Sequence, residues 1–167
     1  CPLDVVLVRK LGVPGRHELA MGAIGEGDIV VSEPSVIEAA HVHDEQFAAI
    51  ERQQRDELGR RARLYRAQHP RLSLEGKQTI IVDDGMATGS TARAACAVVR
   101  AAGAGSILLA VPVAPSGTIR ALRQDADNVI ALATPHPFRA VGYFYGSFSQ
   151  TPDREVIELL DESAERF

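Results

Sequence analysis

The sequence has few lysines, few cysteines and no long apolar run, and each absence excludes a class of protein. Lys10 and Lys77 are the only lysines, and the formal net charge is −4, so no basic field points to nucleic acid. Cys1 and Cys96 are too few for a disulfide framework or a zinc site. No apolar run approaches the length of a membrane span, and no signal peptide is visible. We therefore expect a cytoplasmic protein with neither a membrane nor a nucleic-acid partner.

Two common nucleotide-binding motifs are also missing. The Walker loop needs a lysine before its Ser or Thr, and GMATGST at 85–91 has none. The dinucleotide fingerprint needs G-x-G-x-x-G after a strand. The GAG at 103–105 precedes an expected strand instead, and Gly22, Gly25 and Gly27 have the wrong spacing. These two modes of phosphate binding are therefore excluded.

The remaining pattern predicts an α/β fold. The length of 167 residues fits one domain, and 46% of the residues are hydrophobic, which is ample for one core. In the second half of the chain, apolar runs that suit buried strands alternate with helical patterns. This alternation of strands and helices predicts a parallel sheet flanked by helices, with right-handed crossovers between the strands. The expected strands are 80–82, 106–114 and 128–134, and the expected helices are 92–102 and 116–126.

The first third of the chain predicts a strand, a mobile flap and a long helix. LDVVLV at 3–8 suits a buried parallel strand, and Arg9 and Lys10 follow at its carboxyl end, where open α/β sheets bind ligands. The glycine-rich stretch from 11 predicts a flap that merges into a hairpin, with a strand at 28–32 and an end near 35. Apolar residues at helical spacing predict a helix over about 36–67.

The last third gathers most of the aromatic residues. The segment 135–150 holds Phe138, Tyr143, Phe144, Tyr145 and Phe148, and a final helix over 152–165 follows it. Two interpretations stay open for this hood: its rings stack on a flat base, or they pack against the sheet edge.

The chain is organised around TIIVDDGMATGST at 79–91. An apolar strand ends in Asp83 and Asp84, a loop of small residues follows, and a helix begins directly after it. Amides at a helix N-terminus have no intrahelical partner, and small residues let an anion approach them, so the loop predicts a phosphate cradle. Two carboxylates beside it suit a ligand with hydroxyls or a divalent cation, such as a phosphorylated sugar. We expect Gly89→Val to block the phosphate by sterics alone.

This motif resembles the ribose-phosphate-binding motif of the type I phosphoribosyltransferases, and the likeness extends from Leu3 to about Leu160. The resemblance is greatest to an uncharacterised bacterial branch with VRKLG, DDG-x-ATG-x-T and FSQ motifs. It implies transfer of a phosphoribosyl group from phosphoribosyl pyrophosphate to a nitrogenous base, with Mg²⁺ as cofactor.

The resemblance also implies roles for particular residues. Asp83 and Asp84 would be the catalytic pair, holding the ribose hydroxyls directly or through Mg²⁺ and water. Arg9 and Lys10, with Arg16 and His17 of the flap, would face pyrophosphate. The 5′-phosphate and ribose would be held by the residues of the loop and helix start: Gly85, Ala87, Thr88, Gly89, Ser90 and Thr91.

Two departures from the family pattern stand out. Hypoxanthine–guanine enzymes carry a carboxylate where this chain has Ala87, so the motif is more similar to that of adenine and uracil enzymes. The family also begins with a strand, a pyrophosphate loop and a helix that this sequence lacks before Cys1. That strand would lie between 3–8 and 80–82, and we expect the full gene product to have it. If the gene product lacks that strand, the strands expected at 3–8 and 80–82 must pair with each other, or a neighbouring chain must fill the gap between them.

The sequence leaves the biological role open between an enzyme and a binding module. The alternative to transfer is a non-catalytic module that senses phosphoribosyl pyrophosphate or nucleotides. A structural remnant fused to an enzyme is a third option. The accepting base and the oligomeric state, a homodimer included, are not specified by the sequence.

Overall fold

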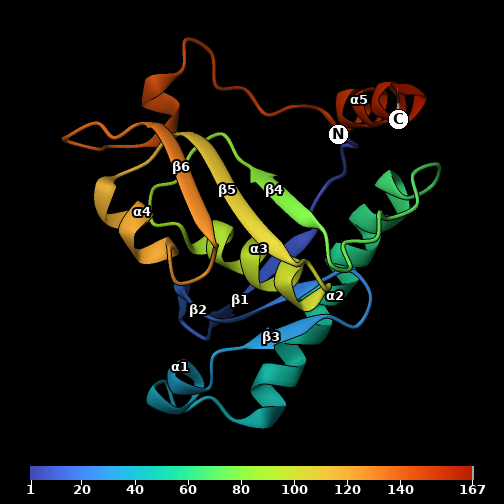
Figure 1. The fold of residues 1–167 in the computed structure, drawn as a ribbon. Helices are drawn as coiled ribbons and strands as arrows, with labels where there is room; N and C mark the ends of the chain where they lie inside the picture. The colour runs from blue at the N-terminus through green and yellow to red at the C-terminus, as the bar shows by residue number, and fades with distance from the viewer. Residues whose placement is uncertain (167) are drawn as a thin grey trace.

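The computed structural model describes residues 1–166, apart from the side chains of His17 and Glu18, and contains two three-stranded sheets (Figure 1). The first sheet is an antiparallel hairpin with one added strand, in the order β1-β2-β3. Its strands are β1 (Val8–Val13), β2 (Arg16–Gly25) and β3 (Val30–Ser32). This part of the chain is the hairpin expected for the flap, but its first strand begins at Val8 and not near residue 11.

The second sheet is parallel, in the order β4-β5-β6, and confirms the predicted α/β class. Each strand is followed by a helix or loop on the way to the next, as parallel pairing requires. The elements are β4 (Gln78–Val82), α3 (Ser90–Ala101), β5 (Ser106–Val113), α4 (Ser116–Leu122) and β6 (Asn128–Ala133).

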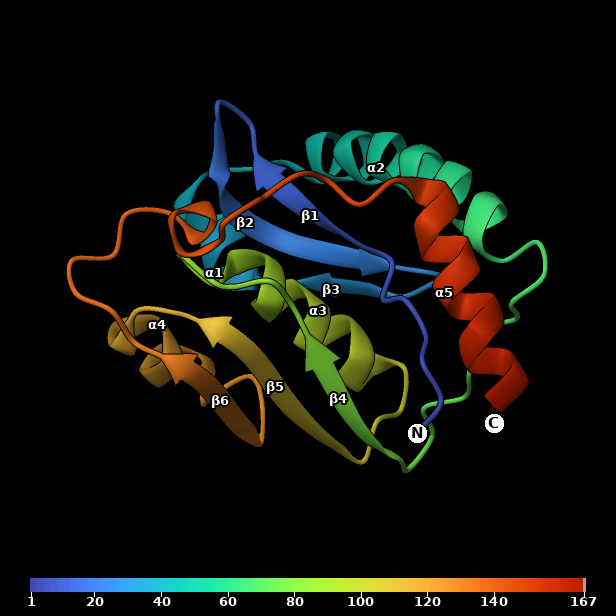
Figure 2. The same cartoon turned by 90° about the horizontal axis from the view of Figure 1, so that it is seen from above.

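Helix α3 lies between the two sheets and joins their cores (Figure 2). On one side it packs with α4 against the parallel sheet, where Ile107, Leu109 and Leu122 are almost fully buried. On the other side Ala94 and Val98 pack against Ala23 of β2. The small residues of α3 explain its position, because alanine lets a helix approach a sheet on both sides.

The outer face of the hairpin sheet is covered by two helices where one was expected. They are α1 (Pro34–Ala39) and α2 (Asp44–Tyr65). The break lies at His41, whose φ of 51° cannot continue a helix, and Val42 next to it is buried in the core. That core also contains Leu11, Met21 and Leu58.

The structure contradicts the strand expected at residues 3–8. Residues 1–7 form no strand, and β1 begins at Val8 and pairs with β2. Arg9 and Lys10 therefore lie inside a strand of the hairpin, not at the carboxyl end of a parallel strand. Among the described residues no strand pairs with residues 1–7, and a run of β-branched residues becomes a strand only where a neighbouring strand shares its hydrogen bonds.

The C-terminal third contains the 3₁₀ turn η1 (Val141–Phe144) and the final helix α5 (Asp153–Arg166), close to the expected bounds. Pro112 lies inside β5, although it follows Ala110, the last β5 residue that pairs with β4.

Within residues 1–166, no helix combines the length and apolar character that crossing a bilayer requires.

Arg66, directly after α2, ties the first residues of the chain to the hairpin sheet. Its guanidinium forms ion pairs with Asp4 and Glu26 and donates to the Val5 carbonyl at 2.9 Å. The side chain is only 13% exposed, and the Glu26 carboxylate raises the pKa of Arg66, so the cation is permanent. Residues 1–7 are thus held in place without belonging to a sheet.

We expect Arg66→Ala to lower the free energy of unfolding by about 3–5 kcal/mol, because it leaves two half-buried carboxylates without their cation. Arg66→Lys should restore only part of the lost stability, since the single ammonium of lysine cannot make all the hydrogen bonds that the planar guanidinium donates. Urea denaturation measures both. Arg154→Ala is the control: Arg154 is 88% exposed in its pair with Glu158, so its removal should cost no more than about 0.5 kcal/mol. Equal losses for the two arginines would contradict the role of Arg66.

Candidate functional site

The candidate site begins where β4 ends, at the carboxyl edge of the parallel sheet. Asp83 and Asp84 follow Val82, and two backbone hydrogen bonds attach this turn to β5. The amide of Asp83 donates to the Ala110 carbonyl at 3.4 Å, and that of Met86 donates to the Val113 carbonyl at 3.0 Å. Ligands of open α/β sheets bind at this edge.

Two side chains from distant parts of the chain also fix the loop. The Thr118 hydroxyl of α4 donates to the Ala87 carbonyl at 2.7 Å. The Tyr145 hydroxyl of the hood donates to the Asp84 carbonyl at 2.5 Å. Because both bonds go to backbone carbonyls, they set the direction of the loop and leave its side chains available.

The start of α3 offers hydrogen-bond donors without protein partners. Gly89 is the N-cap of α3, has φ of 75°, and provides no side-chain cap. Among the described residues, no partner is recorded for the amides of Ala87, Thr88 and Thr91, and the Ser90 amide has only a 3.5 Å contact with the Thr88 hydroxyl. Unpaired amides at the positive end of a helix are suited to bind an anion such as phosphate.

The two carboxylates differ in their surroundings. Asp83 is half-buried, and this burial raises its pKa above the usual range, with a smaller contribution from the charge of Asp84. Its Oδ1 accepts a hydrogen bond from the Asp84 amide at 3.0 Å. Asp84 is exposed. Ionising a half-buried carboxylate costs free energy in the free chain, and a cation or a hydroxyl donor that binds the carboxylate offsets this cost.

The predicted site residues from Asp83 to Thr91 come together in this one loop, whereas Arg9 lies elsewhere. Arg9 points toward α2, where its guanidinium pairs with the Glu57 carboxylate at 3.6 Å. Its Nε is buried and has no hydrogen-bond partner among the described residues. Lys10 is the next residue along β1 and projects from the opposite face of the strand. Their contact with pyrophosphate, and that of Arg16, stays a prediction, and the side chain of His17 lies outside the described residues.

Sequence analysis missed Thr118 and Val141 as residues of the site, and it named Tyr145 only among the hood aromatics, without its hydrogen bond to the loop. Val141 lies against the loop, because a Cβ added at Gly85 would meet its Cγ1 at 2.7 Å. The hood therefore packs against the carboxylate loop through Val141 and Tyr145. The hood rings form the pairs Phe138–Phe144 and Tyr145–Phe148, whose centroids lie 5.3 and 5.2 Å apart, and Phe144 and Phe148 are about half exposed.

Comparison with known proteins places this loop inside a matched domain. A family model described as the phosphoribosyl transferase domain matches residues 32–144. Two Mycobacterium tuberculosis proteins, "Putative phosphoribosyl transferase Rv0571c" (strain ATCC 25618/H37Rv) and "Putative phosphoribosyl transferase MT0597" (strain CDC 1551/Oshkosh), are each 48% identical over 166 residues. The match covers 99% of this chain and 38% of each relative, so the chain spans less than two fifths of their length.

A solved structure is also similar to the chain over most of its length. The crystal structure of TT1426 from Thermus thermophilus superposes with a TM-score of 0.89 at 39% sequence identity. The superposition covers 96% of this chain and 76% of that chain.

The structure changes the expected effect of a substitution at Gly89. A Cβ there would meet Leu122 Cδ1 and Thr118 Cγ2 at 2.9 Å each, so it points at α4 and not at a bound phosphate. Gly89→Val would therefore disturb the fold, and the expectation of a purely steric block is wrong.

We expect Gly89→Ala to lower the free energy of unfolding by about 1–3 kcal/mol, through positive φ together with overlap at α4. Gly15→Ala is the matched control, because Gly15 has φ of 73° but nothing within 4 Å of an added Cβ. Thermal or urea unfolding of both variants separates the two contributions. Losses of the same size would show that the overlap with Leu122 and Thr118 is harmless.

We expect Asp83→Asn to raise the melting temperature at pH 7, because the folded chain ionises this half-buried carboxylate at a cost that asparagine avoids. The gain should shrink as the pH falls through the raised pKa and vanish below the ordinary value of 3.8, where the carboxyl is protonated in both the folded and the unfolded chain. Thermal melts between about pH 3 and pH 8 measure it. Asp56→Asn, on the exposed face of α2, controls for the loss of one negative charge. A lower melting temperature for Asp83→Asn at pH 7 would contradict the assignment.

Proposed function

The chain belongs to the phosphoribosyl transferase domain family, and from this premise we propose that it transfers the 5-phosphoribosyl group from phosphoribosyl pyrophosphate to a nitrogenous base. One observation carries the proposal. Asp83 and Asp84 lie at the end of β4, a few residues before the amides at the start of α3 that have no protein partner among the described residues. This spacing suits a ligand with a phosphate at one end and hydroxyls beside it.

The 5′-phosphate would bind at the start of α3. The amides of Ala87, Thr88 and Thr91 would donate to its oxygens, and the exposed hydroxyls of Thr88 and Thr91 lie in the same segment. The dipole of α3 adds a favourable charge interaction at this end of the helix. The Ala87 carbonyl, which would repel the phosphate, is turned toward α4 by Thr118.

Asp83 and Asp84 would hold the ribose hydroxyls and a Mg²⁺ ion. Mg²⁺ prefers oxygen ligands and is commonly bound by one or two carboxylates together with substrate phosphates, so this donor pair fits it. Within the described residues there is no cluster of three or more His, Cys, Asp or Glu side chains that could hold a metal. When bound, Mg²⁺ would neutralise charge on the leaving pyrophosphate.

In the reaction, the bond from C1 of the ribose to pyrophosphate breaks, and the leaving group takes the electron pair. A ring nitrogen of the acceptor forms the new bond with its lone pair and then releases a proton. Positive charge develops on the ribose in between, and the fixed negative charges of Asp83 and Asp84 would stabilise it. Losing one such contact would cost about two to three decades in rate.

The hood would receive the acceptor. Tyr143, Phe144 and Phe148 are 69%, 43% and 52% exposed, and the segment is bonded to the carboxylate loop through Tyr145. Exposed rings next to the proposed ribose site can stack on a flat heterocycle. Ala87 presents no carboxylate to a purine nitrogen, which disfavours hypoxanthine and guanine as acceptors.

A sensing module that binds the same ligand without turnover is the second candidate. One observation favours it: Arg9, a cation expected at the leaving pyrophosphate, pairs with Glu57 on α2. With this cation engaged elsewhere, the ligand would bind through its phosphate and ribose, and the leaving group would lack its support.

Calorimetric titration with phosphoribosyl pyrophosphate, with and without Mg²⁺, tests the proposal, and a screen of purine and pyrimidine bases for pyrophosphate release follows it. We expect magnesium-dependent binding and release of pyrophosphate with at least one base. Asp83→Asn and Asp84→Asn should each weaken binding by about 30- to 150-fold, since a hydrogen bond to a charged group contributes about 2–3 kcal/mol.

Asp56→Asn removes a carboxylate from the exposed face of α2 and should leave the affinity unchanged. Binding without pyrophosphate release for any base would support the sensing module over the enzyme. Equal affinity in the unaltered chain and in the Asp83 and Asp84 variants would refute the site.

A further inference from the structure

The hood lies between β6, which ends at Ala133, and α5, which begins at Asp153. Its last residues and the link to α5, 146–151, form neither helix nor strand, and no backbone hydrogen bond to them is recorded among the described residues. We call residues 146–151 the connecting segment, and Figure 1 shows it running from the hood to α5. Because the connecting segment has no hydrogen-bonded structure of its own, its course depends on where α5 is held.

Tyr65 binds the first residue of α5. Its hydroxyl donates a hydrogen bond to Asp153 Oδ1, across 88 residues of sequence. Tyr65 is the last residue of α2 and is only 8% exposed, so packing fixes the position of its ring. The hydrogen bond to Asp153, together with burial, raises the pKa of Tyr65, and the hydroxyl therefore remains a donor at neutral pH. A buried tyrosine of α2 thus sets the place where the connecting segment ends.

Helix α5 lies beside the C-terminal end of α2 and turns one side toward it (Figure 2). Five residues at helical spacing share this side: Asp153, Val156, Ile157, Leu160 and Asp161. The three apolar ones are buried or half-buried. At the far end of this side, His69 Nε2 lies 2.7 Å from Asp161 Oδ1, as an electrostatic contact and not an aligned hydrogen bond. The helix is therefore held at both ends of one face.

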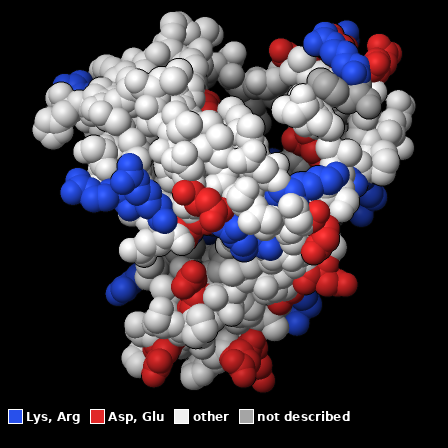
Figure 3. All heavy atoms as spheres, viewed as in Figure 1, with Lys and Arg blue, Asp and Glu red and all other residues white. Residues whose placement is uncertain are grey.

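The opposite side of α5 is charged and faces solvent. Arg154 pairs with Glu158 at 2.7 Å, and Arg166 pairs with Glu162 at 3.4 Å, all four side chains being more than half exposed. Figure 3 shows charged atoms of both signs gathered over α5. The contacts that fix the helix are thus confined to its inner side, where Tyr65 binds.

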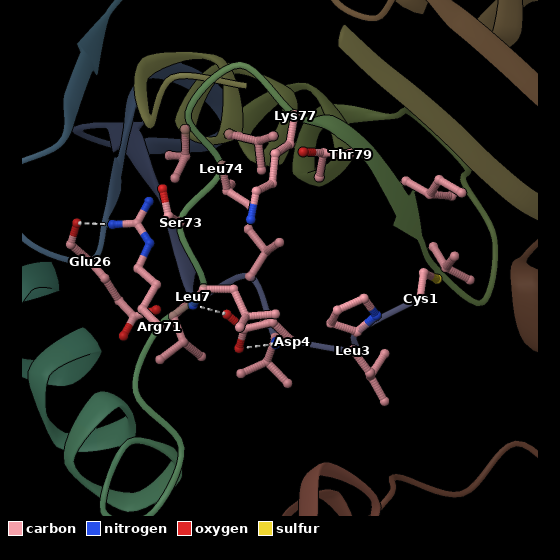
Figure 4. A pocket seen from close by; sticks show the side chains of 18 of the residues that line it. Cys1, Leu3, Asp4, Leu7, Glu26, Arg71, Ser73, Leu74, Lys77 and Thr79 are labelled. Atoms are coloured by element: carbon pink, nitrogen blue, oxygen red, sulfur yellow. Dashed lines mark hydrogen bonds between the residues drawn. The ribbon is translucent and has the colours of Figure 1, made fainter. Parts of the chain in front are cut away.

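A cavity of about 400 Å³ lies between residues 1–7 and Gln78–Val82 (Figure 4). No residue of 83–91 or of 135–150 is among those that line it. An acceptor must reach the ribose beside Asp83 and Asp84, so this cavity does not serve the reaction. The hood remains the aromatic surface that adjoins the carboxylates, and its position therefore matters for the acceptor.

We propose that Tyr65 is a positioning residue of the acceptor site: by holding Asp153 it anchors α5, and α5 keeps the hood against the carboxylate loop. The proposal rests on the proposed function in one respect, that the hood receives the acceptor. The hood already contacts the loop through Tyr145, whose hydroxyl donates to the Asp84 carbonyl at 2.5 Å. An anchor at the other end restricts the positions of the hood, so that an acceptor stacking on its rings loses less freedom on binding.

Hydrogen exchange in Tyr65→Phe tests the anchor, because this change removes the hydroxyl and keeps the buried ring. The amides of Tyr143 and Tyr145 bond to carbonyls within the hood, and we expect them to exchange about 2- to 10-fold faster once one hydrogen bond of the anchor is lost. The amides of β5 should exchange as in the unaltered chain. Asp153→Ala should act like Tyr65→Phe, whereas Asp153→Asn keeps an acceptor oxygen and should preserve slow exchange.

Glu158→Gln is the matched control, since it removes a carboxylate from the exposed side of α5 and should leave exchange in the hood unchanged. In the transfer assay, Tyr65→Phe should raise the KM for the acceptor by about 3- to 10-fold. The KM for phosphoribosyl pyrophosphate and kcat should stay within about twofold, because the phosphate and the ribose bind at the loop. A merely stabilising role would lower the melting temperature without separating the two KM values.

Equal exchange in the hood of Tyr65→Phe and of the unaltered chain would overturn the proposal, and so would an equal rise in both KM values. Hydrogen exchange needs no ligand. If no base reacts, the proposed function fails, and the exchange result still decides separately whether Tyr65 anchors the hood.

Discussion

The structure depends on the parallel pairing of β4 with β5, because this pairing positions the loop that follows β4. The ladder runs from Gln78 to Val82 and continues as two backbone bonds from the loop to Ala110 and Val113. With the strand end fixed, the chain must turn at once toward α3, which packs on the same sheet. The carboxylates and the start of the helix are thereby placed on one edge.

This geometry has an energetic cost that the core offsets. Asp83 is half-buried as an anion, the N-cap Gly89 has positive φ, and the first amides of α3 have no protein partners among the described residues. The half-buried charge and the unpaired amides are unfavourable in the free chain, and a bound cation or anion would offset their cost. The buried contacts of α3 with Ile107, Leu109 and Leu122 supply the opposing free energy.

The sequence predicts the strand, the turn and the helix start of this loop well because their determinants are local. The end of an apolar strand, two aspartates, small residues and a helix start follow one another within a single short segment, and their chemistry is specific. The hydrogen bonds of Thr118 and Tyr145 to the loop escape prediction, since they span 31 and 61 residues of sequence. The strand expected at residues 3–8 fails for another reason. A strand needs a neighbour, and a sequence pattern does not show whether one is present.

The position of β4 at the edge of the described parallel sheet also bears on the site itself. The carboxylate loop is supported on one side by β5, α4 and the hood, whereas the other edge of β4 pairs with no strand among the described residues. An edge strand frays more readily than a central one, and fraying of β4 would move Asp83 directly. The pairing of β4 with β5 limits this movement, because an electrostatic site must stay rigid to act on a developing charge.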